Sequence, residues 1–389
     1  MRAPRAATPY DPSEVGDRTH PKPTASPSPP TSPRTGRQKR IRTGRVGVGV
    51  RARAWAELLR VPALFTVPGD ALAGTAAVSA RPTPRTFLAI ASSLCLYEAG
   101  MALNDWADRD VDAVERPHRP LPSGRIRPAA ALGAACVLTG AGLSFAAWAG
   151  RPALTVAVPL AATVWAYDLA LKNTRLGPAA MATARGLDLL LGASAASSPT
   201  AFPSIRQALP SAALLGAHTL ALTTVSRKEA QGGSSLGPLA ALATTAALTR
   251  LVARPRPLPT DPTGEGRRHG EPPSLKHRTT TARPLPPGPL APPPRRDSPL
   301  RLLDDPPAAL RAALATAYAV TAARPYFHAA LNPSPPLTQR AVAGGIRATI
   351  PLQAALTARS GTKSATLTAL LTTALAPLAT RFARKVSVT

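Results

Sequence analysis

Long apolar stretches alternate with short polar connections along most of the chain. We identify ten such stretches, each close to the roughly 20 residues that a helix needs to cross the hydrocarbon core of a bilayer. They lie near residues 58–79, 86–104, 129–149, 152–168, 178–197, 208–226, 236–252, 308–331, 338–358 and 362–380. Most are rich in Ala, and small residues let helices approach closely in lipid. The pattern predicts an all-α, polytopic transmembrane bundle of about nine helices, with a soluble Ala-rich bundle as the weaker alternative.

Two segments interrupt this pattern and are rich in Pro and Arg. Residues 1–50 and 253–307 show no apolar periodicity, so we predict a disordered tail and a disordered insert. The membrane core is then expected over residues 51–252, and residues 308–389 are expected to supply the last transmembrane helices of the same domain.

The net charge narrows the choice of partners. Lys and Arg number 47 against 20 Asp and Glu, which gives a formal charge of +27. A basic chain suits nucleic acid, anionic lipid or a phosphorylated ligand. Aromatic residues make up only 4% of the chain and are not interleaved with the basic ones. We therefore expect membrane lipid and no nucleic acid as partners.

The distribution of basic residues predicts the orientation in the membrane. The connections at 105–128, 169–177 and 227–235 carry more Arg and Lys than the connections between them. Basic connections stay on the cytoplasmic side of a membrane. The sequence therefore predicts a multi-pass protein of the cell membrane with these three connections in the cytoplasm.

The first of these connections contains a cluster of metal-binding side chains. Asn104, Asp108 and Asp112 recur every four residues, and Asp105 lies three residues before Asp108. On one helix these side chains share a face. Oxygen ligands of this kind suit a hard cation such as Mg²⁺, which commonly completes its shell with substrate phosphates.

Two arginines follow the acidic residues. Arg116 and Arg119 precede the sequence PLPSG, and an Arg side chain can bind phosphate oxygens with two parallel hydrogen bonds. Carboxylates and arginines within about fifteen residues suggest a metal–diphosphate site. The alternative is a solvated, charged loop that only sets the membrane topology.

The combined motif resembles a known family. The pattern NDxxDxxxD, over residues 104–112, followed by RPxRPLPSG, over residues 116–124, is similar to the first Asp-rich motif of the UbiA superfamily of intramembrane aromatic prenyltransferases. In the second connection, Tyr167 and Lys172 resemble a Tyr and a Lys of these enzymes, with one extra residue between them. The resemblance covers residues 58–252 well and 308–380 loosely.

The resemblance implies a Mg²⁺-dependent prenyltransferase whose substrates are a prenyl diphosphate and an unidentified acceptor. It implies that a set of oxygen-bearing side chains holds Mg²⁺: Asn104, Asp105, Asp108 and Asp112. The three aspartates and Lys172 would be catalytic. Substrate binding would involve Asn104, Arg116, Arg119, Tyr167, Arg227, Lys228 and Glu229.

The third connection departs from the family pattern. Typical members carry a second Asp-rich motif there, but this chain has only Glu229 as an acid, after Arg227 and Lys228. A second metal site is therefore in question, and the chain most resembles the branch related to EboC. Because the second motif has so few acidic residues, a non-catalytic protein that binds or transports an isoprenoid lipid is a further alternative.

Two further expectations concern other residues. Arg185 and Asp188 are spaced so that they could pair within the fifth apolar segment. A CDP-alcohol phosphotransferase-like enzyme is another alternative, although residues 104–125 lack the order of Asp, Gly, Ala and Arg that such enzymes carry.

Overall fold

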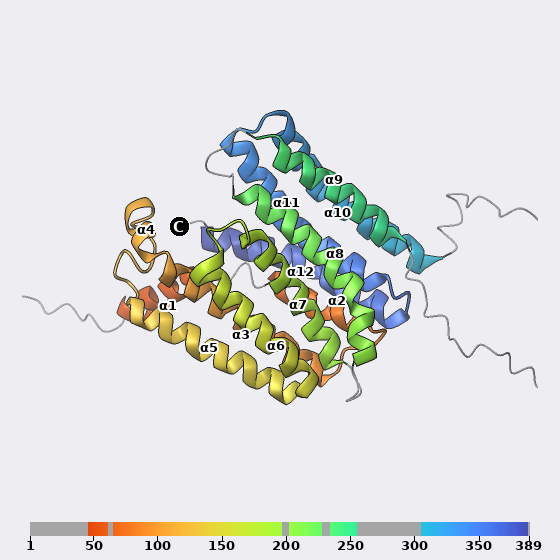
Figure 1. The fold of residues 1–389 in the computed structure, drawn as a ribbon, viewed down its shortest axis with the longest axis horizontal. Coiled ribbons are helices and arrows are strands. Elements are labelled where there is room, and N and C mark those ends of the chain that lie inside the picture. The colour runs from red at the N-terminus through yellow and green to blue at the C-terminus, as the bar shows by residue number, and fades with distance from the viewer. Residues whose placement is uncertain (1–45, 61–64, 197–201, 228–233, 255–304, 388–389) are drawn as a thin grey trace, which may run out of the picture. The chain divides into compact units, whose positions relative to one another are not determined.

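The computed structural model describes residues 46–60, 65–196, 202–227, 234–254 and 305–387. Regular structure in these ranges is helical throughout, which confirms the predicted all-α fold (Figure 1). The predicted insert lies almost wholly outside the described residues. So does the predicted tail, apart from its last five residues, where the first helix begins.

The helices are distributed along the whole described chain. In order they are α1 (Val46–Leu58), α2 (Val67–Ala77), α3 (Pro84–Ala107), α4 (Arg109–Glu115), α5 (Pro128–Ala149), α6 (Arg151–Ala166), the π-helical turn η2 (Tyr167–Leu171), α7 (Gly177–Ala195), α8 (Phe202–Ser226), α9 (Leu236–Ala253), α10 (Pro306–Leu331), α11 (Pro335–Ala358) and α12 (Lys363–Ser387). Many of them begin with a Pro in the first turn, as in α3, α5 and α11. Pro fits there because the first helical N–H groups have no partner within the helix.

Each of the ten predicted apolar stretches overlaps a helix. Within the described ranges, five segments are long and apolar enough to cross a membrane: Pro84–Ala107, Pro128–Ala149, Arg151–Leu171, Ile205–Ser226 and Leu236–Ala253. The predicted stretch at 58–79 differs most, because α2 has only 11 residues. Helix α11 has 15 of its 24 residues buried by neighbouring helices, so its side chains face protein more than lipid.

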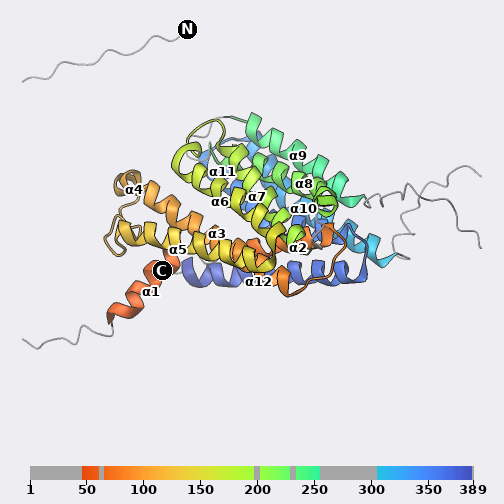
Figure 2. The same ribbon diagram turned by 60° about the horizontal axis from the view of Figure 1, so that its bottom comes forward.

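The helices pack in two groups. Helix α3 packs along α5, and α6 packs on α7, as Figures 1 and 2 show. Helices α8 to α11 pack on one another and enclose the largest group of buried apolar side chains, which includes Leu215, Tyr318 and Leu352. Helix α2 connects the two groups, because it packs against both α7 and α11.

The contact between α2 and α7 depends on two glycines. A Cβ atom placed on Gly74 would lie 1.8 Å from the carbonyl oxygen of Leu189, and one on Gly192 would lie 2.1 Å from that of Ala71. No side chain fits at either position without moving a helix backbone. Close approach of helices at small residues is a common way of packing in membranes, where the hydrophobic effect does not drive helices together.

We expect Gly192→Ala to lower the free energy of unfolding in detergent by about 1–3 kcal/mol, because the methyl group forces α2 and α7 apart. Gly133→Ala is the matched control, because a Cβ atom there meets nothing within 4 Å. Thermal unfolding of the purified variants measures both effects. Equal midpoints for the two variants would show that the α2–α7 contact is not tight.

Candidate functional site

The acidic motif lies where α3 ends and α4 begins. Helix α3 ends at Ala107, and Asp108 has φ of −89° and ψ of 2°, so one continuous helical face is interrupted there. Backbone hydrogen bonds still continue across the break, from Asp108 N to Asn104 O and from Asp112 N to Asp108 O. By their ion-pair partners the three carboxylates fall into two groups, and that the four side chains share one helix face stays a prediction.

Asp105 and Asp112 form the first group, and a single guanidinium joins them. Arg119 Nη1 lies 3.5 Å from Asp105 Oδ1 and 2.7 Å from Asp112 Oδ2. Arg60 Nη2 also reaches Asp105 Oδ1 at 3.3 Å, and Arg116 Nη1 reaches Asp112 Oδ1 at 3.6 Å. Both carboxylates are buried, so burial without these cations would cost several kcal/mol per charge.

Asp108 belongs to the second group and pairs with Lys172. The two side chains approach to 2.6 Å between Oδ1 and Nζ, and the Lys172 side chain is 12% exposed. Lys172 could have been a solvent-facing residue at the membrane surface. Its burial against a motif carboxylate instead places the second connection beside the first.

The turn that carries Lys172 is a π-helix. In η2 the N–H of Lys172 donates to the carbonyl of Tyr167 at 2.8 Å, five residues earlier. A π-helical turn accommodates one residue more than an α-helical turn, and such turns often occur at functional sites. This turn has room for the one extra residue that the resemblance implies between Tyr167 and Lys172.

The loop after α4 is held against α1. Arg125 binds both oxygens of Glu57, at 2.7 Å and 3.1 Å, and donates to the carbonyl of His118 at 2.6 Å. Hydrogen bonding to the Glu57 carboxylate raises the pKa of the Arg125 guanidinium. Gly124 has φ of +72°, a conformation that favours glycine and explains its place in the motif.

The third connection approaches the second through one contact. Arg227 donates from Nη1 to the carbonyl of Thr174, so the end of α8 lies beside the turn after Lys172. Lys228 and Glu229 lie outside the described residues.

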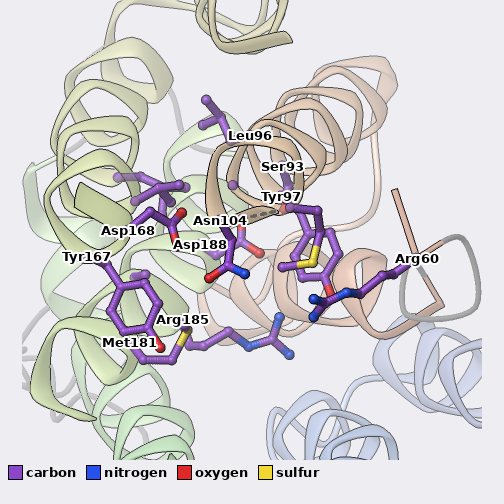
Figure 3. A pocket seen from close by; sticks show the side chains of 15 residues that line it. Arg60, Ser93, Leu96, Tyr97, Asn104, Tyr167, Asp168, Met181, Arg185 and Asp188 are labelled. Carbon is purple, nitrogen blue, oxygen red and sulfur yellow. Dashed lines mark hydrogen bonds between the residues drawn. The ribbon is translucent and has the colours of Figure 1, made fainter. Parts of the chain in front are cut away.

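A cavity of about 230 Å³ lies beside the motif, between α3, α6, η2 and α7. Figure 3 shows Asn104, Tyr167, Asp168, Arg185 and Asp188 around it. Much of its wall is apolar, formed by Leu96, Met101, Leu160, Val164 and Met181. Asn104 and Tyr167 therefore face the cavity as the predicted substrate-binding role requires, whereas Asp105 and Asp112 lie outside its lining.

Two residues of this region were not anticipated from the sequence. Arg60 lines the cavity and contacts Asp105, and Asp168 lines it next to Tyr167 with 4% of its surface exposed. A carboxylate within an apolar segment is itself an indication of function, and this indication could have identified Asp168. Arg60 lies near the start of the predicted stretch 58–79, where a basic side chain can also extend to the membrane surface, so its position gave a weaker indication.

The predicted pairing of Arg185 with Asp188 is not what the structure records. Arg185 Nη1 pairs with Asp70 Oδ2 of α2 at 2.8 Å, and Asp188 accepts a hydrogen bond from Ser93 of α3. Both contacts cross between helices, which a spacing rule within one helix cannot reveal. Arg185 and Asp188 both line the cavity.

The described residues contain no ready-made group of three acidic, His or Cys side chains around one point. Asp105 and Asp112 nevertheless direct one oxygen each at a single cationic atom, Arg119 Nη1. Two carboxylate oxygens that converge on one positive charge fit a divalent cation of the Mg²⁺ type, which binds through one or two carboxylates and takes further ligands from phosphate and water.

Comparison with known proteins gives consistent matches. Residues 63–249 match the sequence model of the UbiA prenyltransferase family. The digeranylgeranylglyceryl phosphate synthase of Methanothrix thermoacetophila is 39% identical over 125 residues, which cover 31% of this chain and 47% of that protein. In such alignments the chain spans about half the length of its curated relatives.

Two solved structures are similar to this chain at low sequence identity. An apo UbiA homologue from Aeropyrum pernix K1 is 17% identical, with 72% of this chain and 96% of that chain covered and a TM-score of 0.46. A UbiA homologue from Archaeoglobus fulgidus, bound to GPP and Mg²⁺, is 18% identical, with 51% and 76% covered and a TM-score of 0.43.

We expect a double-mutant cycle of Asp108→Asn and Lys172→Met to give a coupling free energy of about 1–2 kcal/mol, because the pair is largely buried and in contact. Thermal unfolding of the single and double variants in detergent measures the coupling. The control cycle uses Arg109→Met and Asp110→Asn, an exposed pair at 3.5 Å. Equal coupling in both cycles would show that Lys172 does not hold the motif in place.

Proposed function

Because this chain belongs to the UbiA prenyltransferase family, we propose that it transfers a prenyl group from a prenyl diphosphate to an acceptor, with Mg²⁺ as cofactor. The observation that carries this proposal is the convergence of Asp105 and Asp112 on one cationic point beside an apolar cavity. The diphosphate would lie at the motif, and the prenyl chain would occupy the apolar part of the cavity, along Leu160 and Val164.

Asp105 and Asp112 would hold the metal ion, with Asn104 and Asp108 as neighbouring oxygen donors. The chemistry that bound Mg²⁺ supplies is neutralisation of charge on the diphosphate leaving group. Which of the four side chains bind directly stays a prediction, because Asp108 also pairs with Lys172.

Three cationic side chains would stabilise the departing diphosphate. Arg116 and Arg119 already contact Asp112, so they offer guanidinium donors next to the proposed metal site. Lys172 adds an ammonium group through its contact with Asp108. Stabilising charge on the leaving group is usually the largest contribution that such a site makes to catalysis.

The cavity would protect the reactive allylic group from water. Leu96, Leu160 and Val164 form an apolar wall, and exclusion of water prevents hydrolysis of a reactive intermediate. Tyr167 and Asn104 lie in the same lining and would position the substrate. Arg227, Lys228 and Glu229 stay predicted substrate-binding residues.

One alternative function is favoured by a specific observation. The third connection contains a single acid, Glu229, where related enzymes carry a second Asp-rich motif. A protein that binds or transports an isoprenoid lipid without turnover would need only one such motif. The CDP-alcohol phosphotransferase alternative is set aside, because the chain belongs to the UbiA family. Assignment to the branch related to EboC stays a prediction.

The chain is a multi-pass membrane protein, and its orientation is part of the proposal. Two contacts bring the three basic connections to one side of the bundle, from Asp108 to Lys172 and from Arg227 to Thr174. We infer that this side faces the cytoplasm of the cell, because basic connections are retained there.

We expect Asp105→Asn and Asp112→Asn to reduce Mg²⁺-dependent turnover of geranyl diphosphate by at least about 100-fold. Release of pyrophosphate and equilibrium binding of geranyl diphosphate are measured together. Asp110→Asn is the control, because it makes the same change at a side chain that is 84% exposed. Unchanged binding in both motif variants would refute the site. Wild-type binding without pyrophosphate release, with any acceptor tested, would favour the lipid-binding alternative.

Cysteine labelling tests the orientation. In a chain without Cys95 and Cys136, we expect Ser123→Cys and Ser234→Cys to react with a membrane-impermeant maleimide from the cytoplasmic side. Arg151→Cys, in the turn between α5 and α6, should react only from the opposite side. Reaction of the two serine positions from different sides would contradict the proposed topology.

A further inference from the structure

Two guanidiniums and two carboxylates line the cavity, and they differ in their partners. Arg60 pairs with Asp105 at 3.3 Å and Arg185 pairs with Asp70 at 2.8 Å, and both of these carboxylates lie outside the lining. The two carboxylates within the lining, Asp168 and Asp188, have no ion pair among the described residues. The carboxylates of the wall are therefore the charged groups without an ion-pair partner of their own.

Asp188 lies at the inner end of the cavity. Its partner Ser93 precedes Asn104 by eleven residues on α3, which corresponds to roughly 16 Å along a helix. Ser93, Arg185 and Asp188 are here called the inner polar group. Ser93 and Asp188 are 2% and 7% exposed, so this group is enclosed by protein while it faces the cavity.

A side chain from the C-terminal helices supports the inner polar group. Gln353 of α11 is completely buried and donates from Nε2 to Asp70 Oδ1 at 2.5 Å and to the carbonyl of Thr66 at 2.6 Å. Asp70 in turn binds Arg185. Helix α11 lies beyond residues 63–249, the part that matches the family, and it still fixes a side chain of the cavity.

An isoprenoid chain would be a poor ligand for this end of the cavity. A buried carboxylate that loses its polar partners is costly, and a hydrocarbon chain offers none. An anionic group would meet the carboxylates of Asp168 and Asp188, while the guanidinium of Arg185 is already paired with Asp70. A neutral group that donates a hydrogen bond would instead satisfy the Asp188 carboxylate without charge repulsion.

We propose that the inner polar group binds a hydroxyl group of the acceptor, and that the acceptor is a neutral, hydroxyl-bearing molecule, not an anionic one. This inference rests on the proposed function, because it concerns the second substrate of the same cavity. Asp188 accepts the hydrogen bond from the acceptor, and Ser93 holds the Asp188 carboxylate in place. Gln353 is a positioning residue that acts through Asp70, which pairs with Arg185 and is hydrogen-bonded to Asp188.

The test compares two lipids that differ only by a phosphate. Purified full-length protein in detergent is titrated with 1-oleoylglycerol and with 1-oleoylglycerol 3-phosphate, in the presence of Mg²⁺ and a non-hydrolysable geranyl diphosphate analogue. We expect 1-oleoylglycerol to bind at least about tenfold more tightly, because like charges facing each other weaken association. Equal or tighter binding of the phosphate lipid, or binding of neither lipid, overturns the proposal.

Variants of the inner polar group give the second part of the test. Asp188→Asn should reduce the preference between the two lipids to less than about threefold, and Gln353→Leu should weaken 1-oleoylglycerol binding by about tenfold. Asp110→Asn, an equivalent change on an exposed side chain, should alter neither value. If Asp188→Asn fails to fold, Ser93→Ala replaces it and should also weaken 1-oleoylglycerol binding. An unchanged preference in the Asp188 or Ser93 variant overturns the proposal.

A separate titration with geranyl diphosphate and Mg²⁺ distinguishes this inference from the proposed function. Gln353→Leu should bind geranyl diphosphate as the wild type does, because Gln353 belongs neither to the acidic motif nor to the cavity lining. Failure of the wild type to bind geranyl diphosphate would refute the proposed function alone. Normal binding together with a preference for the anionic lipid would refute the acceptor inference alone.

Discussion

The cost of an unpaired charge in an apolar interior determines how this protein is organised around its cavity. Asp105 and Asp112 are buried; Arg60, 45 residues earlier in the chain, accompanies Asp105, and Arg119 of the same connection contacts both. Lys172 forms an ion pair with Asp108, and Arg185 forms one with Asp70. Each pairing draws two helices or loops together. The acidic motif is thus both the proposed chemical centre and the point where the connections meet.

Close helix packing gives these pairs their fixed geometry. Glycines at the crossing of α2 and α7 bring the backbone of one helix against that of the other. Asp70 of α2 and Arg185 of α7 are thereby held at ion-pair distance, 2.8 Å. Small residues replace the large apolar side chains that would drive packing in a water-soluble core. The Ala-rich composition therefore suits a scaffold that fixes polar side chains inside a membrane protein.

Local patterns predicted much of the fold and part of the site. Apolar stretches of the right length identified the helices, and the spacing of Asn104, Asp105, Asp108 and Asp112 identified the motif. Contacts between distant residues could not be predicted, because no local rule brings Arg60 to Asp105 or Gln353 to Asp70. The break at Asp108 was missed for a similar reason: its side chain turns toward Lys172, 64 positions later in the sequence.

The π-helical turn at Tyr167–Leu171 bears on how such a protein can change during evolution. A residue inserted into a regular helix rotates everything after it by about 100° and would carry Lys172 away from its partner. A π-helical turn holds one residue more than an α-helical turn, so an added residue there would leave α7 and the lysine in place. Asp168 lies in this turn and lines the cavity next to Tyr167. A widened turn is thus a position where one inserted codon could change a site without disturbing the residues around it.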